Sequence, residues 1–325
     1  MKEVQFIKNN SERWREVELF LSKKTSFQDP DKLAELFIQL TDDLSYSKTF
    51  YPQSKTTQYL NSLTSKVHQS VYKNKKEKRS RIISFWKYEL PEIFFVRRNE
   101  LLISFVVFLI AIVIGVVSSE GDTGFVRLIL GDSYVNMTKE NINQGDPLAV
   151  YKKMNGVDML IGITFNNIRV SFYAFISGLL LSVGTILLLL YNGIMLGTFH
   201  YFFFERNLLF ESLSIVWIHG TIEISSIIIA GAAGLILGNS ILFPKTFSRR
   251  QSFLIAAKEG VKIIVGLIPL FILAGFLESF VTRFTQMPII FNLTIILSSI
   301  VFLVWYVIIY PLKLSRREKN ESTEN

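Results

Sequence analysis

The sequence contains no cysteine. This absence excludes disulfide bonds, thiolate metal sites and cysteine nucleophiles. The chain also lacks a phosphate-binding glycine loop, a serine nucleophile elbow, a paired-carboxylate hydrolase site and the HExxH zinc signature. We therefore expect no enzymatic activity, no cofactor and no metal.

We also expect no cleavable signal peptide at the start of this sequence. The first 30 residues are polar and charged, whereas a signal peptide has an apolar core close to its amino terminus. We expect the first long hydrophobic run to act as the membrane-insertion signal.

Long apolar runs dominate the chain after residue 100. Half of the 325 residues are hydrophobic, and the mean hydropathy is +0.35. A membrane-spanning helix needs about 20 predominantly apolar residues. The expected fold class is therefore all-α: a polytopic membrane helix bundle of about six spans with an amino-terminal soluble helical region. The expected spans are residues 101–118, 168–190, 192–210, 213–238, 261–281 and 290–311, the third being the weakest.

Positive charges indicate the topology. The formal net charge is +8, and basic residues gather before the first span, in the loop 239–260 and in the tail. Such segments stay on the cytoplasmic side and are attracted to anionic lipid. Six spans place both termini in the cytoplasm at the cell (inner) membrane. We expect membrane lipid, and no nucleic acid, as the partner of these charges.

The chain divides into three regions on this topology. Residues 1–98 form a cytoplasmic helical region that ends in a basic, aromatic-rich segment at the membrane interface. Residues 99–312 form the membrane bundle, and 313–325 form a basic, disordered cytoplasmic tail. Residues 119–165 are too polar to span and lie outside the cell, either as a docking surface for a partner or as a lid over the bundle.

Three amphipathic helices are expected before residue 72. Asp29 is the expected N-cap of the second helix, and Pro30 its first residue. Packing as a small bundle and docking to a partner both remain open. The apolar residues at helical spacing are Trp14, Val17, Phe20, Leu21, Leu33, Leu36, Phe37, Leu40, Leu60, Leu63, Val67 and Val71.

Two ionisable residues stand inside the fourth expected span. His219 and Glu223 are four residues apart, so they share one face of a helix. Glu223 falls roughly midway through the bilayer, where a lone carboxylate is costly and should have a partner. His219 is the expected partner, Gly220 lies between them, and His200 on the preceding span is expected at similar depth.

Three interpretations of this intramembrane polar motif stay open. The pair can join helices structurally. It can relay a proton or an ion in a transporter. It can also belong to a zinc site of two histidines and one glutamate, although a complete ligand set does not follow from the sequence.

Small residues at four-residue spacing predict close helix packing within the membrane, or a homo-oligomer. They are Gly178 and Ser182, Gly193 and Gly197, and Ala230, Gly231, Gly234 and Gly238. A second polar set is expected near the outer face, where it either rings the mouth of a cavity or marks helix ends. Its members are Asn166, Asn167, Arg169, Glu278 and Arg283, with Glu205 and Arg206 in a nearby turn.

These segments resemble the stage II sporulation protein M family of multi-pass membrane proteins. The resemblance rests on "NNIRVSFYAFISG" (166–178), "GTILLLLYNGIMLG" (184–197), "HGTIEISSIIIAGAAGLILG" (219–238) and "FLESFVT" (276–282), and it covers about residues 95–312. The HGxxE element falls on His219, Gly220 and Glu223. The resemblance implies a membrane scaffold that recruits peptidoglycan-degrading partners.

The expected function is therefore an integral membrane scaffold for cell-envelope remodelling. Its expected partners are envelope hydrolases or other membrane proteins. The alternative is a transporter or channel with a polar pathway at His219 and Glu223.

Overall fold

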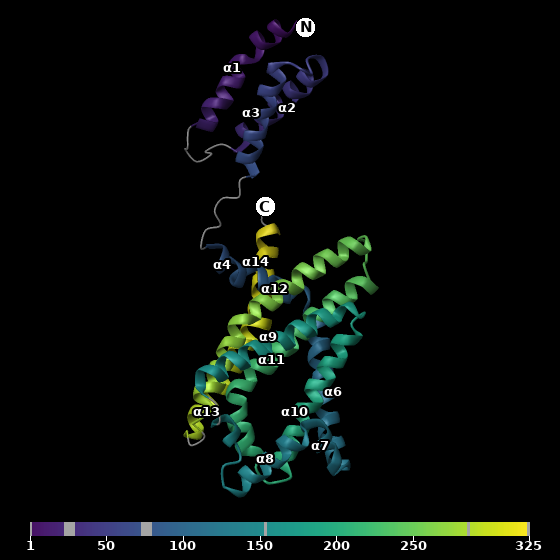
Figure 1. Cartoon of the computed structure of the whole chain (residues 1–325), viewed down its shortest axis with the longest axis vertical. Helices are drawn as coiled ribbons and strands as arrows, with labels where there is room; N and C mark the ends of the chain where they lie inside the picture. The colour runs from purple at the N-terminus through teal and green to yellow at the C-terminus, as the bar shows by residue number, and fades with distance from the viewer. Residues whose placement is uncertain (1, 23–29, 73–79, 153–154, 285–286, 324–325) are drawn as a thin grey trace. The chain divides into compact units, whose positions relative to one another are not determined.

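The computed structural model describes residues 2–22, 30–72, 80–152, 155–284 and 287–323, and these ranges contain helices and turns but no strand. The chain divides into two compact units, residues 1–81 and 82–325 (Figure 1). The expected all-α class is confirmed.

The amino-terminal unit contains three helices, as predicted: α1 (Glu3–Ser22), α2 (Pro30–Phe50) and α3 (Lys55–Tyr72). Its core joins the apolar stripes of all three. The expected N-cap Asp29 and the side chains of Phe20, Leu21, Leu33 and Val71 lie outside the described residues. The buried core residues are Phe6, Trp14, Val17, Leu36, Leu40, Leu44, Leu60, Leu63 and Val67.

One acidic side chain is buried in this unit. Asp43 on α2 is 9 % exposed and accepts hydrogen bonds from the Arg13 guanidinium (2.8 Å) and the Trp14 indole N–H (2.9 Å) on α1. A buried carboxylate needs such donors. This contact therefore fixes the register of α1 against α2.

Six helices of the described residues are long and apolar enough to cross a membrane, as expected. Asn155 is the N-cap of the second of these helices and Ser248 is the N-cap of the fifth. Each side-chain oxygen accepts a hydrogen bond from a backbone N–H. The six are α6 (Arg98–Gly121), α9 (Gly156–Ile176) with η3 (Ser177–Leu179), α10 (Val183–Phe204), α11 (Leu209–Leu242), α12 (Arg249–Phe276) with η4 (Leu277–Val281), and α13 (Ile289–Val304) with η5 (Trp305–Ile309) and the start of α14 (Tyr310–Thr323).

The second and third spans differ from the sequence prediction of 168–190 and 192–210. The chain turns between Leu179 and Val183, where Leu181 and Ser182 have φ of 52° and 68°. Hydropathy does not register this turn because apolar residues continue through it. This turn ends the second span at Leu179, and the helix of that span begins at Gly156. Residues 156–165 of the expected outer segment therefore belong to the second span.

The rest of that segment forms α7 (Thr123–Leu130), α8 (Asp132–Asn143) and η2 (Ala149–Lys152). Its Val126, Val135 and Leu148 are buried in one cluster with Phe202 and Phe203 at the end of α10. In Figure 1, α7 and α8 lie across one end of the membrane helices. The apolar face of the segment is therefore used inside the chain.

The expected interfacial segment forms α4 (Ser80–Ser84), η1 (Phe85–Glu89) and α5 (Leu90–Val96). Residues 73–79, which hold most of the basic stretch before these helices, lie outside the described residues. Hydrogen bonds and ion pairs attach the helical segment to the bundle. Tyr306 donates a hydrogen bond to the Trp86 carbonyl (2.7 Å), and Lys262 lies 2.6 Å from Glu89. Disorder was expected over 313–325, but residues 313–323 are helical because α14 continues to Thr323. Residues 324–325 lie outside the described residues.

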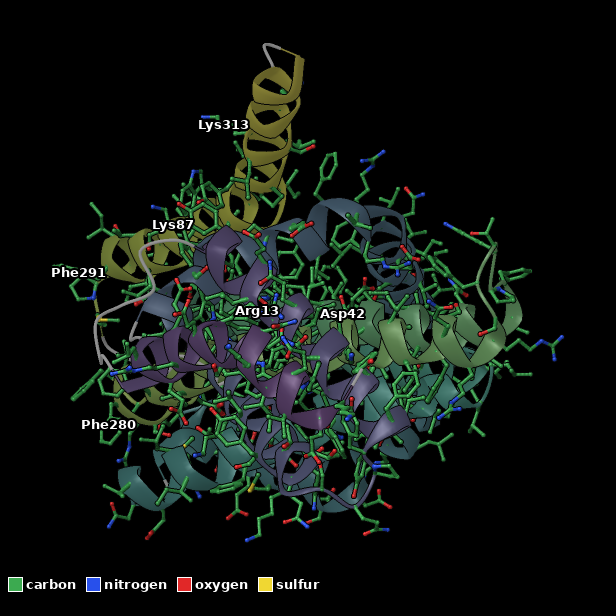
Figure 2. The ribbon with its side chains drawn as sticks, turned by 90° about the horizontal axis from the view of Figure 1, so that it is seen from above. Arg13, Asp42, Lys87, Phe280, Phe291 and Lys313 are labelled. Atoms are coloured by element: carbon green, nitrogen blue, oxygen red, sulfur yellow. The ribbon has the colours of Figure 1, made fainter. Side chains whose placement is uncertain are left out.

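Large apolar side chains cover the outside of the bundle. Phe291 on α13 is 58 % exposed, and Figure 2 shows it directed away from the ribbon. Exposure of this kind suits contact with lipid tails.

The small residues stand where helices approach most closely. A Cβ on Gly178 would lie 2.1 Å from the Gly234 carbonyl oxygen, and one on Gly197 would lie 2.2 Å from the Ile112 carbonyl oxygen. Such distances are too short for any side chain, so these backbones touch directly. Gly193 and Gly238 also lie against backbone atoms of other segments, Gly238 against Ser182. Gly231 lies against the side chains of Leu189 and Ser104, and Ala230 is fully buried.

Candidate functional site

Two residues of the candidate site lie on α11, a helix of 34 residues. At about 51 Å, this helix is longer than the roughly 30 Å hydrocarbon thickness of a bilayer. His219 and Glu223 lie on one face of it, and Glu223 is about 21 Å from the start of the helix. His219 is 4 % exposed, and Glu223 is partly buried.

Glu278 joins this pair from another helix. It lies on η4, a π-helical turn that follows α12. Its carboxylate oxygen Oε2 is 3.8 Å from His219 Nε2. One nitrogen or oxygen of each of His219, Glu223 and Glu278 lies within 4.8 Å of the others. π-Helical turns inside α-helices are frequent at functional sites, because the extra residue re-aims the side chains.

The hydrogen bonds behind His219 assign its tautomer. Thr282 donates its hydroxyl proton to the Leu277 carbonyl at 3.2 Å, and its oxygen lies 3.0 Å from His219 Nδ1. With its proton used on Leu277, the hydroxyl accepts from Nδ1–H. In the neutral ring the lone pair is then on Nε2, the nitrogen nearer Glu278.

A cavity of about 660 Å³ lies beside the three residues. Its walls come from α9, α10 and α11, and Ile129, Tyr134 and Val150 of α7, α8 and η2 also line it. Two glutamates and one histidine face this space, and among the described residues that line it there is no lysine or arginine. Within the described part of the chain, His219 is therefore the one basic side chain that lines the cavity beside the two acids.

Two further residues adapt the cavity wall. Asn167 on α9 is 3 % exposed and lies beside Glu223, and among the described residues its amide nitrogen has no hydrogen-bond partner. Gly220 lines the cavity, and a Cβ there would meet only Val216 Cγ1 at 3.9 Å. Asn167 thus has a donor left for a bound group or for a rotated Glu223, and Gly220 keeps the wall open.

The other predicted site residues lie apart from this cluster. His200 accepts a hydrogen bond from the Trp217 indole at 3.1 Å, and it does not line the cavity. Arg169 donates to Asn166 at 3.2 Å and is exposed, and Asn166 lines the cavity.

The expected ring at the outer face does not form as one group. Arg206 pairs with Glu205 at 2.8 Å, and the Arg283 guanidinium lies near Gly156 at the start of α9. The sequence prediction placed Glu278 in this ring and Asn167 at the start of a span. The structure places both at the cluster, because α9 begins earlier and η4 lies against α11. Thr282 and Tyr134 are further site residues that sequence reasoning missed.

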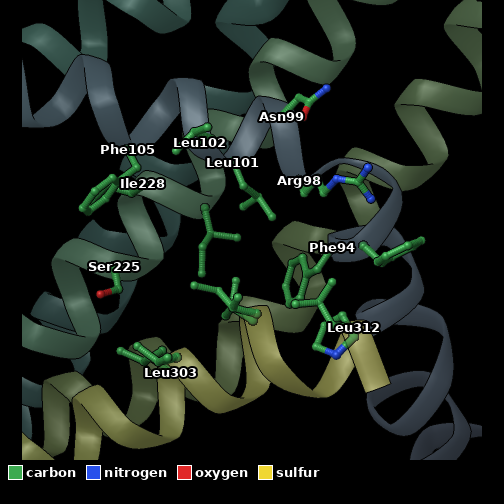
Figure 3. Close-up of a pocket in the computed structure, with 16 residues that line it drawn as sticks. Phe94, Arg98, Asn99, Leu101, Leu102, Phe105, Ser225, Ile228, Leu303 and Leu312 are labelled. Carbon is green, nitrogen blue, oxygen red and sulfur yellow. The ribbon is translucent and has the colours of Figure 1, made fainter. Parts of the chain in front are cut away.

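A second cavity of about 660 Å³ has a different character. Phe94, Leu101, Leu303 and Leu312 surround it (Figure 3). Arg98 is the single charged residue among the described residues that line it. Its lining suits an apolar group, so the ionisable cluster is confined to the first cavity.

Comparisons with known proteins agree with this architecture. A family model described as a domain of unknown function (DUF8413) matches residues 4–73, which corresponds to the amino-terminal unit. Among curated proteins and among solved structures, none matches the chain. The family model of Stage II sporulation protein M matches residues 104–283, a stretch of more than half the chain that contains His219, Glu223 and Glu278. The chain belongs to the Stage II sporulation protein M family.

Proposed function

We propose that this membrane protein transports a cation through the cavity beside His219, Glu223 and Glu278. One observation supports the proposal: two carboxylates and an imidazole gather in a cavity between apolar helices, and none of the described residues that line it is a lysine or an arginine. Ionisable groups in membrane spans are costly, and they commonly mark ion and proton pathways.

The electrostatics favour a mobile cation. Two carboxylates that share a site repel each other, and loss of water strengthens the repulsion. A helix-joining role would be served better by a fixed arginine or lysine opposite each acid. A cavity supplies the space in which a proton or a metal ion arrives, neutralises the site and leaves.

The proposed orientation places the cavity toward the outside of the cell. The loop between α11 and α12 carries Lys245, and the first turns of α12 carry Arg249, Arg250 and Lys258. These charges favour the cytoplasm for this end of the bundle and for both termini. Helices α7, α8 and η2, which contribute to the cavity lining, then lie on its outer side. Because their apolar face packs against α10 and lines the cavity, a lid fits them better than a docking surface.

Flux through reconstituted vesicles tests the proposal. Full-length protein is placed in liposomes, with a pH-sensitive dye for protons and a zinc-sensitive dye for a divalent cation inside. We expect flux of at least one of the two above that of protein-free vesicles, reduced at least tenfold by Glu223→Gln and by Glu278→Gln. Glu205→Gln, which alters an exposed acid outside the cavity, is the matched control and retains flux. Absence of flux for both cations, or flux that both variants retain, contradicts transport.

A scaffold for envelope remodelling is the second candidate, and the amino-terminal unit favours it. That unit is compact, has its own core and matches a separate family model. A protein that only transports a cation has no evident use for it. Removal of residues 1–72 is then expected to displace tagged peptidoglycan hydrolases from their sites in cells and to leave vesicle flux unchanged. Unchanged hydrolase positions would contradict the scaffold.

A further inference from the structure

We propose that His219, Glu223 and Glu278 form a binding site for a divalent first-row transition metal ion of the zinc class. This site rests on the proposed function, because it lies in the same cavity and holds the cation there. Binding of the ion does not depend on whether the protein also transports it.

The donor set selects this class of ion. One imidazole nitrogen and two carboxylate oxygens suit zinc and its neighbours, whereas magnesium and calcium favour sites made of oxygen alone. No thiolate is present to favour copper(I), since the chain has no cysteine. Three protein ligands with a fourth position open are the arrangement of zinc sites that exchange their outer ligand, and here the cavity provides that position.

The spacing of the donors is close to what the ion requires. Zinc binds nitrogen and oxygen at about 2.0–2.2 Å in tetrahedral geometry, which places ligand atoms about 3.3–3.6 Å apart. His219 Nε2 and Glu278 Oε2 are already 3.8 Å apart, and all three donor atoms lie within 4.8 Å. Small rotations of the two glutamate side chains bring the set to binding distance.

The surroundings orient the ligands as metal sites do. Histidines that bind a metal usually donate their other N–H to a nearby oxygen. His219 does so through Nδ1 to Thr282, whose hydroxyl is fixed by the Leu277 carbonyl. The deeply buried Asn167 contributes an N–H donor that lies beside Glu223 and has no partner within the described part of the chain. This donor can hold the carboxylate oxygen that does not bind the metal.

Metal binding to the full-length protein tests the inference. The protein is purified with a tag that contains no histidine, embedded in lipid nanodiscs, stripped with a chelator and titrated with Zn²⁺ against a chromogenic competitor. We expect one tight site per chain. His219→Gln and Glu278→Gln are expected to weaken binding at least tenfold, and Thr282→Val about 10–100-fold through its effect on the ligand. His200→Gln and His68→Gln remove the other two histidines and are expected to leave affinity unchanged.

Cobalt binding provides a second measurement, which uses only the wild-type protein and therefore does not require that any variant folds. Co²⁺ bound to the wild-type site is expected to show the intense visible absorption of a four-coordinate ion, and Zn²⁺ is expected to displace it. The absence of a tight site, binding unaffected by His219→Gln and Glu278→Gln, or displacement of Zn²⁺ by millimolar Ca²⁺ would overturn the inference. Tight zinc binding without flux refutes only the transport function, and proton flux without zinc binding refutes only the metal site.

Discussion

Substitution of Gly234 by alanine is expected to destabilise the bundle, whereas the same substitution at Gly220 on the same helix is not. A Cβ at Gly234 would lie 2.2 Å from the Ala174 carbonyl oxygen and 2.3 Å from Thr185 Oγ1. Ordinary contact begins at 3.4 Å, so α9 and α11 must separate by about 1.2 Å. Thr185 also donates a hydrogen bond to the same carbonyl at 2.8 Å, and the methyl group would displace it.

The magnitude follows from these contacts. Overpacking of this kind costs about 1–3 kcal/mol, and loss of the hydrogen bond costs about 0.5–1.5 kcal/mol. The better helix propensity of alanine returns up to about 1 kcal/mol. With the full propensity gain subtracted, we expect the free energy of unfolding to fall by about 0.5–3.5 kcal/mol for Gly234→Ala. Gly220→Ala meets only Val216 at 3.9 Å, so its expected change lies between zero and a gain of about 1 kcal/mol.

Reversible unfolding in mixed micelles, followed by circular dichroism over a denaturing-detergent titration, measures both values. The comparison removes the effect of helix propensity, because both residues lie within α11. Equal stability of the two variants would refute the packing argument. A loss confined to Gly220→Ala would show that the cavity wall, and not the crossing of α9 with α11, limits stability.

Two further predictions concern the amino-terminal unit. Asp43→Ala leaves the Arg13 and Trp14 donors without their acceptor. Hydrogen exchange of the full chain is expected to show that the free energy of opening falls by about 1–3 kcal/mol across α1–α3. Asp42 is exposed, and Asp42→Ala is the control that should show no loss. Partial burial raises the pKa of Tyr59 from 10.0 to about 12. As pH rises, the Tyr59 hydroxyl therefore ionises in the unfolded unit before it ionises in the folded unit. The stability that the protonated Tyr59 contributes below pH 10 is then lost between pH 10 and about 12. Tyr59→Phe should remove that part of the alkaline loss in a denaturant titration, and an unchanged alkaline profile would contradict the burial argument.

The helical fold was predictable because its determinants are local. Runs of about 20 apolar residues require helices in a bilayer, where every backbone polar group must be bonded within its own segment. The stripes around Trp14, Leu40 and Leu63 indicate three amphipathic helices in the same way. The pairing of His219 with Glu223 on one face also follows from the helical period alone.

The boundary between the second and third spans was not predictable from hydropathy. The turn at Leu181 and Ser182 lies in a continuous apolar run and contains neither glycine nor proline. Its position is set by contacts with α11, where Gly178 meets Gly234 and Ser182 meets Gly238. Those contacts moved Asn167 from the expected start of a span to the buried wall beside Glu223.

The sequence by itself determined six apolar helices, a helical amino-terminal region and an acid–imidazole pair at membrane depth, because hydrophobicity and helical period act over neighbouring residues. Only the tertiary structure decided that Glu278 completes the cluster, that Asn167 faces it and that His200 bonds Trp217 instead. Those relations depend on how far one helix slides and turns against another, which close backbone contacts between small residues fix. No local pattern records that register.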